Sequence, residues 1–329
     1  MVDTPLVSVV LPFYNAPFLK EAIESILHQS FQNFELVLVN NASTDESVEV
    51  AKSFASHDRV ILIHEEQRGV AHAANAGIRA SKGQFIARMD ADDIAFPERL
   101  KQQVEMLEAE DDLGVASGLV EYLGPAENKG FIHYVNWLNT ITEADEITLN
   151  QFVEFPIANP TTMIRKPLFE SYGMFEDNEF PEDYAFFLRL QSHGVKMKKV
   201  DQPVLKWRDT ENRLTRTDKR YTQDAFFSAK AVYLSKWLKN HNPFHPQVWV
   251  WGAGRVSRRR SDYLKKEGIT IAGYIDVKEG EGIHHYDNLP DKEEAFVVSY
   301  VSNRGARDEI RSFLIEKGYE EGEHFILAS

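Results

Sequence analysis

The chain of 329 residues contains no cysteine. This absence excludes disulfide bonds, thiolate metal sites and cysteine nucleophiles, and it is typical of a cytosolic protein. The first residues, Met-Val-Asp-Thr-Pro-Leu, lack the basic and apolar segments of a signal peptide. The apolar runs of the chain are too short to span a bilayer. We therefore expect a cytoplasmic protein that is either soluble or peripheral at the inner face of the membrane.

Positive charge is scarce, because 37 Lys and Arg residues stand against 51 Asp and Glu residues and give a formal net charge of −14. A general nucleic-acid binder needs a basic face, so nucleic acid is not an expected partner. Two short segments, Lys196–Lys199 and Arg255–Arg260, are candidates for a local basic patch. A hydrophobic content of 43% is ample for packed cores, and the length gives room for about two domains of roughly 150 residues.

Strand and helix patterns alternate in the first part of the chain. Apolar runs of strand length lie at Leu6–Leu11, Phe34–Val39, Val60–Ile63 and Phe85–Met89. A helix capped by Ser43 or Thr44 is expected after the second run, and a small-residue helix is expected over Val70–Ala80. This alternation predicts an α/β fold with a parallel sheet flanked by helices.

Polar residues follow three of these predicted strands. Tyr14, Asn40 and Asp90 each come directly after a strand's carboxyl end. Ligands of open α/β sheets bind at the carboxyl ends of the strands, so these three segments are expected to converge on one crevice.

An acidic cluster, Asp90, Asp92 and Asp93, ends the fourth predicted strand. Carboxylates this close repel each other unless a cation lies among them, and their oxygens suit a hard divalent cation such as Mg²⁺ or Mn²⁺. The alternative is a solvated acidic turn. The position of the cluster at a strand's carboxyl end favours a site.

The C-terminal part begins a second α/β pattern. We expect three parts, namely residues 1–217, a helix and linker over 218–246, and a small Rossmann-like domain over 247–329. The turn Gly252-Ala253-Gly254 lacks the third glycine of a dinucleotide fingerprint, because Ser257 stands in its place. Asp276 nevertheless lies where a ribose-binding acid is expected. A structural or docking role is favoured over cofactor binding.

Several motifs in order resemble those of the family 2 nucleotide-sugar glycosyltransferases, which have the GT-A fold. They are Val-Ser-Val-Val-Leu-Pro-Phe-Tyr-Asn (7–15), Val-Asn-Asn-Ala-Ser-Thr-Asp (39–45), Arg-Gly-Val-Ala-His-Ala-Ala-Asn-Ala-Gly-Ile (68–78), Ala-Arg-Met-Asp-Ala-Asp-Asp (87–93), Pro-Glu-Arg-Leu (97–100) and Glu-Asp-Tyr with its Leu-Arg-Leu (182–190). The last part of the chain resembles an appendage of some bacterial members.

The resemblance implies an inverting transfer of a sugar from a nucleoside-diphosphate sugar to an acceptor hydroxyl. The acceptor would be a saccharide or a lipid-linked saccharide, and the usual setting is surface-polysaccharide assembly at the inner face of a bacterial membrane. Pro12 and Tyr14 would border the nucleobase and ribose, and Asn40 would hydrogen-bond the base.

The resemblance also implies the catalytic groups. Asp90 and Asp92 would form the DxD element that holds ribose and a Mn²⁺ or Mg²⁺ ion, with Asp93 beside them. Asp183 would be the general base and Glu182 its neighbour. The alternative for this acidic pair is helix capping alone.

Two departures from the family pattern bear on the donor. Asn40 stands where the family commonly has Asp, so the donor base can differ from uracil. Ala74 stands where many members have Arg, which removes one diphosphate contact. Four arginines are candidates to replace it, unless they are surface residues: Arg68, Arg88, Arg213 and Arg216.

Three other functions remain open from the residues. A nucleotidyltransferase also places carboxylates at such a sheet edge, but it usually has a glycine-rich, basic loop where Pro-Phe-Tyr-Asn-Ala-Pro stands here. An oxidoreductase would use Gly252–Gly254. A catalytically silent scaffold would use the appendage to recruit partners. The donor sugar, the acceptor and the oligomeric state do not follow from the sequence.

Overall fold

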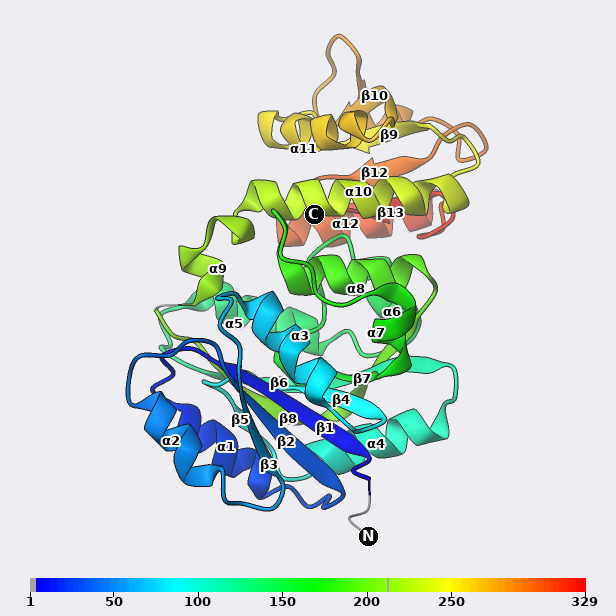
Figure 1. Ribbon diagram of the computed structural model, residues 1–329. Helices are drawn as coiled ribbons and strands as arrows, with labels where there is room; N and C mark the ends of the chain where they lie inside the picture. Colours follow the sequence, from blue (N-terminus) through cyan, green and yellow to red (C-terminus); the bar gives the residue numbers. More distant parts are fainter. Residues whose placement is uncertain (1–3, 212) are drawn as a thin grey trace. The chain divides into compact units, whose positions relative to one another are not determined.

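The computed structural model describes residues 4–211 and 213–329 and divides into two compact units (Figure 1). The first unit comprises Met1–Ile147 and Pro156–Asp218, and the second comprises Thr148–Phe155 and Lys219–Ser329. The expected division into residues 1–217, 218–246 and 247–329 remains a prediction. No helix among the described residues is both long enough and apolar enough to cross a membrane.

The first unit is built on an eight-stranded sheet with the order β3-β2-β1-β4-β7-β6-β8-β5. Its strands are β1 (Val7–Phe13), β2 (Phe34–Asn40), β3 (Val60–His64), β4 (Phe85–Arg88), β5 (Ile94–Ala95), β6 (Leu113–Leu123), β7 (Met163–Arg165) and β8 (Lys196–Arg208). β3, β2, β1 and β4 are parallel, whereas β7 is antiparallel to both of its neighbours. The α/β fold and the four predicted strands are confirmed.

Helices cover both faces of this sheet (Figure 1). The helices of the chain up to Thr217 are α1 (Leu19–Leu27), α2 (Ser47–Phe54), α3 (Val70–Ala80), α4 (Arg99–Ala109), α5 (Lys129–Asn139), α6 (Ala144–Asn150), α7 (Pro167–Tyr172), α8 (Glu182–Ser192) and α9 (Leu214–Thr217), with a 3₁₀ turn at Asn159–Thr161. Alternate residues of a strand face opposite sides. Leu36 and Leu38 therefore join the core that contains α1 and α4, while Val37 and Val39 pack with Ala73 of α3.

Helix α3 lies unusually close to the sheet. A Cβ atom on Gly77 would come within 2.4 Å of a methyl group of Val10 and 3.0 Å of one of Val39. Only glycine allows this approach, and the small-residue pattern that predicted a helix over Val70–Ala80 is the pattern that α3 uses.

Strand β8 is the main element that the sequence pattern missed. Its first residues had suggested a basic patch, but Lys198 pairs with Glu110 at 2.8 Å, and the buried Lys199 donates to the carbonyl of Leu138. Lys198 is therefore paired with a carboxylate and Lys199 is buried, so the two lysines do not form a free cationic surface.

The second unit has a parallel five-stranded sheet with the order β11-β10-β9-β12-β13. Its strands are β9 (Gln247–Trp251), β10 (Thr270–Asp276), β11 (Ile283–His285), β12 (Val297–Ser299) and β13 (Phe325–Leu327), and its helices are α10 (Gln223–His241), α11 (Arg255–Lys266) and α12 (Arg304–Glu316), with 3₁₀ turns at Lys219–Tyr221 and Tyr286–Asn288. Asp276 accepts a hydrogen bond from the backbone N–H of Ala253 at 2.6 Å. This acid is therefore engaged by the glycine turn itself.

Candidate functional site

The strand order brings three polar segments to one edge of the first unit's sheet. β1 and β2 end side by side, because Phe13 pairs with Asn40, and Pro12 pairs with Val39 one step earlier. β4 lies on the other side of β1 and runs parallel to it. The segments after β1, β2 and β4 therefore leave the sheet at the same edge.

Tyr14 and Arg68 form a partly exposed pair at this edge. The Tyr14 side chain is 43% exposed, and the guanidinium carbon of Arg68 lies 3.9 Å from the centre of its ring. A planar guanidinium stacked on an aromatic ring is stabilised by the ring's negative face and keeps its N–H donors free at its rim. The pair can therefore offer both a flat surface and positive charge to a ligand.

Asn15 joins the loop after β1 to the loop after β2. Its backbone N–H donates to Ser43 Oγ at 3.1 Å, and its Oδ1 accepts from the N–H of Thr44 at 2.9 Å. The prediction that Ser43 or Thr44 caps α2 is wrong, because the helix begins at Ser47 and Glu46 occupies the N-cap position. The carboxylate of Asp45 accepts from the N–H of Ser47 at the start of that helix instead.

Two neighbouring asparagines at the end of β2 are buried and bonded. Asn40 Oδ1 accepts from the N–H of Ser43 at 2.9 Å, and its Nδ2 lies 3.2 Å from Nδ1 of His64. Asn41 Oδ1 accepts from the N–H of Gly69, the residue that precedes α3, at 2.8 Å. Asn41 was not among the predicted site residues, although it shares the strand-end position that pointed to Asn40. The predicted contact between Asn40 and a base remains a prediction.

Asp90 and Asp92 lie in different surroundings. The Asp90 side chain is 37% exposed and accepts a hydrogen bond from Arg88 Nη2 at 3.1 Å. Burial, and then the charge of Asp90, raise the pKa of Asp92 to about 6. A cation beside such a carboxyl favours its ionised form, so this pair is electrostatically suited to one.

Asp93 has a structural partner. It is buried, and its Oδ1 accepts from the backbone N–H of Arg208 at 2.8 Å, which ties the end of β8 to the acidic turn. Burial, and then the charges of Asp92 and Asp90, raise the pKa of Asp93 well above its usual range. Within residues 4–211 and 213–329, no three His, Cys, Asp or Glu side chains are arranged to hold a metal ion. The predicted role of Asp93 as a ligand therefore remains a prediction.

Asp183 lies in the first turn of α8 and shares the electrostatic field of the acidic turn. Burial and, to a smaller extent, the negative charge of Asp90 raise the pKa of Asp183. A hydrogen bond from the backbone N–H of Tyr184 at 2.7 Å lowers it. The guanidinium of Arg88 also lowers the pKa of Asp183. These influences require Asp183 to lie within electrostatic range of both Asp90 and Arg88.

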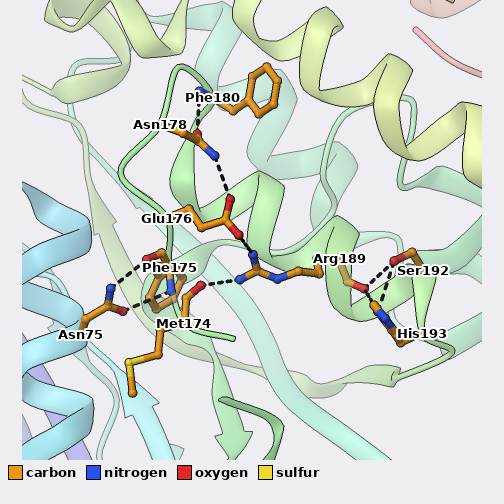
Figure 2. Close-up of polar contacts among 9 residues, drawn as sticks. All are labelled: Asn75, Met174, Phe175, Glu176, Asn178, Phe180, Arg189, Ser192 and His193. Carbon is orange, nitrogen blue, oxygen red and sulfur yellow. Dashed lines mark hydrogen bonds and ion pairs between the residues drawn. The ribbon is translucent and has the colours of Figure 1, made fainter. Parts of the chain in front are cut away.

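The segment that leads into α8 is held by side chains of α3 and α8, among them Asn75 and Arg189 (Figure 2). Asn75 of α3 forms a two-way bond with Phe175, donating from Nδ2 to its carbonyl at 2.8 Å and accepting its N–H at 3.1 Å. Arg189 of α8 donates to the carbonyl of Met174 and to the carboxylate of Glu176. None of these residues had been assigned a role in the site. Asn75 and Arg189 lie within the family motifs, but the bond between Asn75 and Phe175 joins residues 100 positions apart, which no local pattern reports.

Two of the candidate arginines lie on the segment that follows β8. The guanidinium of Arg213 packs 4.7 Å from the ring of Trp207, and its charge opposes the rise in the pKa of Asp92. Arg216 pairs with Asp209 at 2.7 Å. Arg213 is therefore the one of this pair that acts on the acidic turn.

Residues 8–173, about half of the chain, match the family model described as Glycosyl transferase family 2. The chain belongs to this family. The resemblance drawn from the motifs is confirmed, and the protein is a glycosyltransferase.

Relatives of this glycosyltransferase include two microbial proteins. The glycosyltransferase MJ1057 of Methanocaldococcus jannaschii is 28% identical over 256 residues, which are 76% of this chain and 85% of the relative. The glycosyltransferase EpsJ of Bacillus subtilis is 30% identical over 223 residues, which are 64% of this chain and 63% of EpsJ. The aligned part is thus less than two thirds of EpsJ.

Solved structures show the same type of fold. S. aureus TarS 1–349 in complex with UDP has a TM-score of 0.55 at 18% identity, covering 79% of this chain and 70% of TarS. The mannosyltransferase PcManGT from Pyrobaculum calidifontis, in complex with GDP-Man and Mn²⁺, has a TM-score of 0.50 at 20% identity. The match covers 73% of this chain and 65% of PcManGT. At these identities the likeness shows the GT-A type fold alone.

Proposed function

We propose that this glycosyltransferase is an inverting, metal-dependent enzyme that transfers a sugar from a nucleoside-diphosphate sugar to an acceptor hydroxyl. The observation that carries the proposal is the geometry of the sheet edge, where the segments after β1, β2 and β4 leave side by side and the partly exposed Asp90 lies among them. The charge of Asp90 also contributes to the raised pKa of Asp183, which lies more than ninety residues later in the chain. In this reaction the donor site and the base must face each other, so Asp90 at the donor site and Asp183 as the base are expected to influence each other electrostatically.

The donor is proposed to lie along the edge from Tyr14 to the acidic turn. Pro12, Tyr14 and Asn40 would border its nucleoside, and Arg68 would supply positive charge near the diphosphate. Structures of TarS with UDP-GlcNAc and of PcManGT with GDP-Man concern donors of this chemical class, which supports a nucleotide sugar here.

Asp90 and Asp92 are proposed to hold a Mn²⁺ or Mg²⁺ ion together with the donor. Such an ion, when bound, supplies positive charge to a leaving diphosphate. The raised pKa of Asp92 fits this role, since the ion would favour the ionised carboxylate. Asp93 would stabilise the acidic turn through the hydrogen bond that it accepts from the backbone N–H of Arg208.

Asp183 is proposed to accept the proton of the acceptor hydroxyl as its oxygen attacks the anomeric carbon. The bond to the diphosphate breaks on the opposite face of the sugar, so the anomeric configuration inverts. A positioned base contributes typically about 10²–10⁴-fold to such a rate. The acceptor is proposed to be a saccharide or a lipid-linked saccharide in bacterial surface polysaccharide or glycoconjugate assembly, at the inner face of the membrane.

The test is calorimetric titration of the protein with UDP and with GDP, in the presence and absence of MnCl₂. We expect Mn²⁺ to strengthen binding of one nucleotide at least tenfold in the wild type, and the Asp92→Ala variant to lose this gain. The exposed Asp111 provides a matched control, because Asp111→Ala should retain it. Equal affinity of wild type and Asp92→Ala with Mn²⁺ would contradict the metal site.

The donor itself can be found by thermal unfolding with a panel of UDP-, GDP- and dTDP-sugars. The true donor should raise the melting temperature in a metal-dependent way, because a ligand that binds only the folded state stabilises it.

A further inference from the structure

The segment between α7 and α8, residues 173–181, has neither helical nor strand structure, and it ends directly before Glu182 and Asp183. A segment of this kind does not fix the direction of the next helix by its own backbone bonds. Its position depends on the side chains that hold it. One contact is that of His72 of α3, whose Nε2 lies 3.0 Å from the carboxylate of Asp177, and two further side chains bond to the segment's backbone or to its acidic residue.

The first of these side chains is Asn75. Its amide is matched to the backbone of Phe175 as both donor and acceptor, at 2.8 Å and 3.1 Å (Figure 2). An amide is required for this pairing, because a carboxylate would accept the N–H and repel the carbonyl.

Helix α3 gives Asn75 a rigid base. Gly77 brings the helix against β1 and β2, and the N–H of Gly69, the residue that precedes the helix, donates to Asn41 directly after β2. The loop after β2 and the segment before Asp183 are therefore bonded to the same part of the chain, at Gly69, which precedes α3, and at Asn75 within it.

The second side chain is Arg189, six residues after Asp183 on α8. Its side chain is only 14% exposed, and its guanidinium reaches back to Met174 and Glu176. Glu176 is held in turn by Asn178, whose Nδ2 donates to it at 3.0 Å. Helix α8 is thus tied to the segment that precedes it, with Asp183 at the junction.

We propose that Asn75 and Arg189 are positioning residues, which together hold the segment 174–181 against α3 and α8 and so fix the place of the Asp183 carboxylate relative to the donor. The inference rests on the proposed role of Asp183 as the base. Neither residue touches the reacting atoms. Displacement of a base by about 1 Å can cost on the order of a hundredfold in rate.

The test uses Asn75→Asp, Arg189→Met and the control Ser192→Ala in the full chain. Ser192 lies near the end of the same helix, where its hydroxyl bonds to the backbone carbonyl of Arg189 and to the neighbouring His193 ring but not to segment 174–181 (Figure 2). Because water can replace the acceptor, the reaction measured is release of nucleoside diphosphate from UDP-GlcNAc or GDP-mannose with MnCl₂, whichever the wild type hydrolyses faster.

We expect Asn75→Asp and Arg189→Met each to lower kcat at least tenfold, while the donor KM and the Kd of the matching nucleoside diphosphate stay within twofold of wild type. Hydrogen exchange of peptides covering 174–183 should become faster in both variants and stay unchanged in Ser192→Ala. A purely structural role would instead lower donor affinity and kcat together. Unchanged kcat in folded variants, or a parallel loss of affinity, would overturn the proposal.

Two further variants separate the possible failures. Arg189→Lys keeps a positive charge but can reach only one of the two acceptors at a time. Its kcat should therefore fall between those of wild type and Arg189→Met. If Arg189→Met does not fold, Arg189→Lys is the variant that tests the proposal. Asp183→Asn tests the base itself. If Asp183→Asn remains active, the proposed base is wrong; if it is inactive while Asn75→Asp and Arg189→Lys match wild type, only the positioning role is wrong.

Discussion

The guanidinium of Arg88, fully buried at the end of β4, donates from Nη2 to the carboxylate of Asp90 at 3.1 Å. It also donates from Nη1 to the carbonyl of Val10 in β1 at 3.1 Å. Asp90 therefore has one side bonded to the sheet and another exposed to solvent. Arg88, considered earlier as a diphosphate contact, is instead an internal counter-ion of the acidic turn.

Replacement of Arg88 should weaken both the fold and the site. Arg88→Met removes two hydrogen bonds of a charged donor, so we expect a loss of about 2 kcal/mol in the free energy of unfolding. We also expect Mn²⁺-dependent nucleotide binding to weaken, because Asp90 loses the group that fixes it. Denaturant unfolding and calorimetry measure the two effects. Arg59→Met is the control, since that arginine lies at the opposite end of the strands; equal losses in both variants would contradict a specific role.

Gly77→Ala should destabilise the first unit. The added methyl group meets Val10 at 2.4 Å, a distance that real side chains do not adopt, and is tight against Val39 at 3.0 Å. Overpacking of this kind costs about 1–3 kcal/mol. Gly130→Ala in α5 is a matched control, because nothing lies within 4 Å of its Cβ position. That variant should be neutral or slightly stabilised. Thermal unfolding of both proteins checks the difference, and equal melting temperatures would contradict the close packing of α3.

Lys230 predicts a pH dependence in the second unit. It is buried in α10, donates to the carbonyls of Val153 at 3.1 Å and Ala328 at 3.0 Å, and burial lowers its pKa to about 7. Between about pH 7 and its ordinary pKa of 10.5, the unfolded chain binds a proton that the folded chain does not. Stability attributable to this group should therefore rise with pH in that window, by up to about 1.4 kcal/mol per unit.

The Lys230→Met variant should lose this slope. The free energy of unfolding of the wild type minus that of the variant, measured by denaturant titration from about pH 7 to about pH 10, is expected to increase as the pH rises. The exposed Lys239 on the same helix is the control. A constant difference across the range would show that Lys230 does not change its protonation on unfolding.

The regular elements could be predicted because their signals are local. The buried runs of β1 and β2 and the small-residue helix α3 are legible from burial and periodicity alone. Strand β8 was missed because its lysines and Pro203 hide the alternation of buried residues, which depends on pairing with β6. The sequence alone does not show which lysine of β8 lies beside a carboxylate in the folded chain.

The site was predictable only to the level of segments. A strand-end position pointed to Asp90 and Asn40, and the family motifs pointed to Asp183. The bond between Asn75 and Phe175 joins residues 100 positions apart, and the burial of Arg88 depends on neighbouring strands. Such relationships arise from tertiary packing, so no local pattern reports them.

The central claim is that Asp183 acts as the base for a donor held beside Asp90 and Asp92. Its most direct test is the rate of donor hydrolysis by Asp183→Asn at saturating nucleotide sugar and MnCl₂. A loss of at least about a hundredfold in kcat is the expected result. A kcat within threefold of wild type would contradict the account and place the base elsewhere.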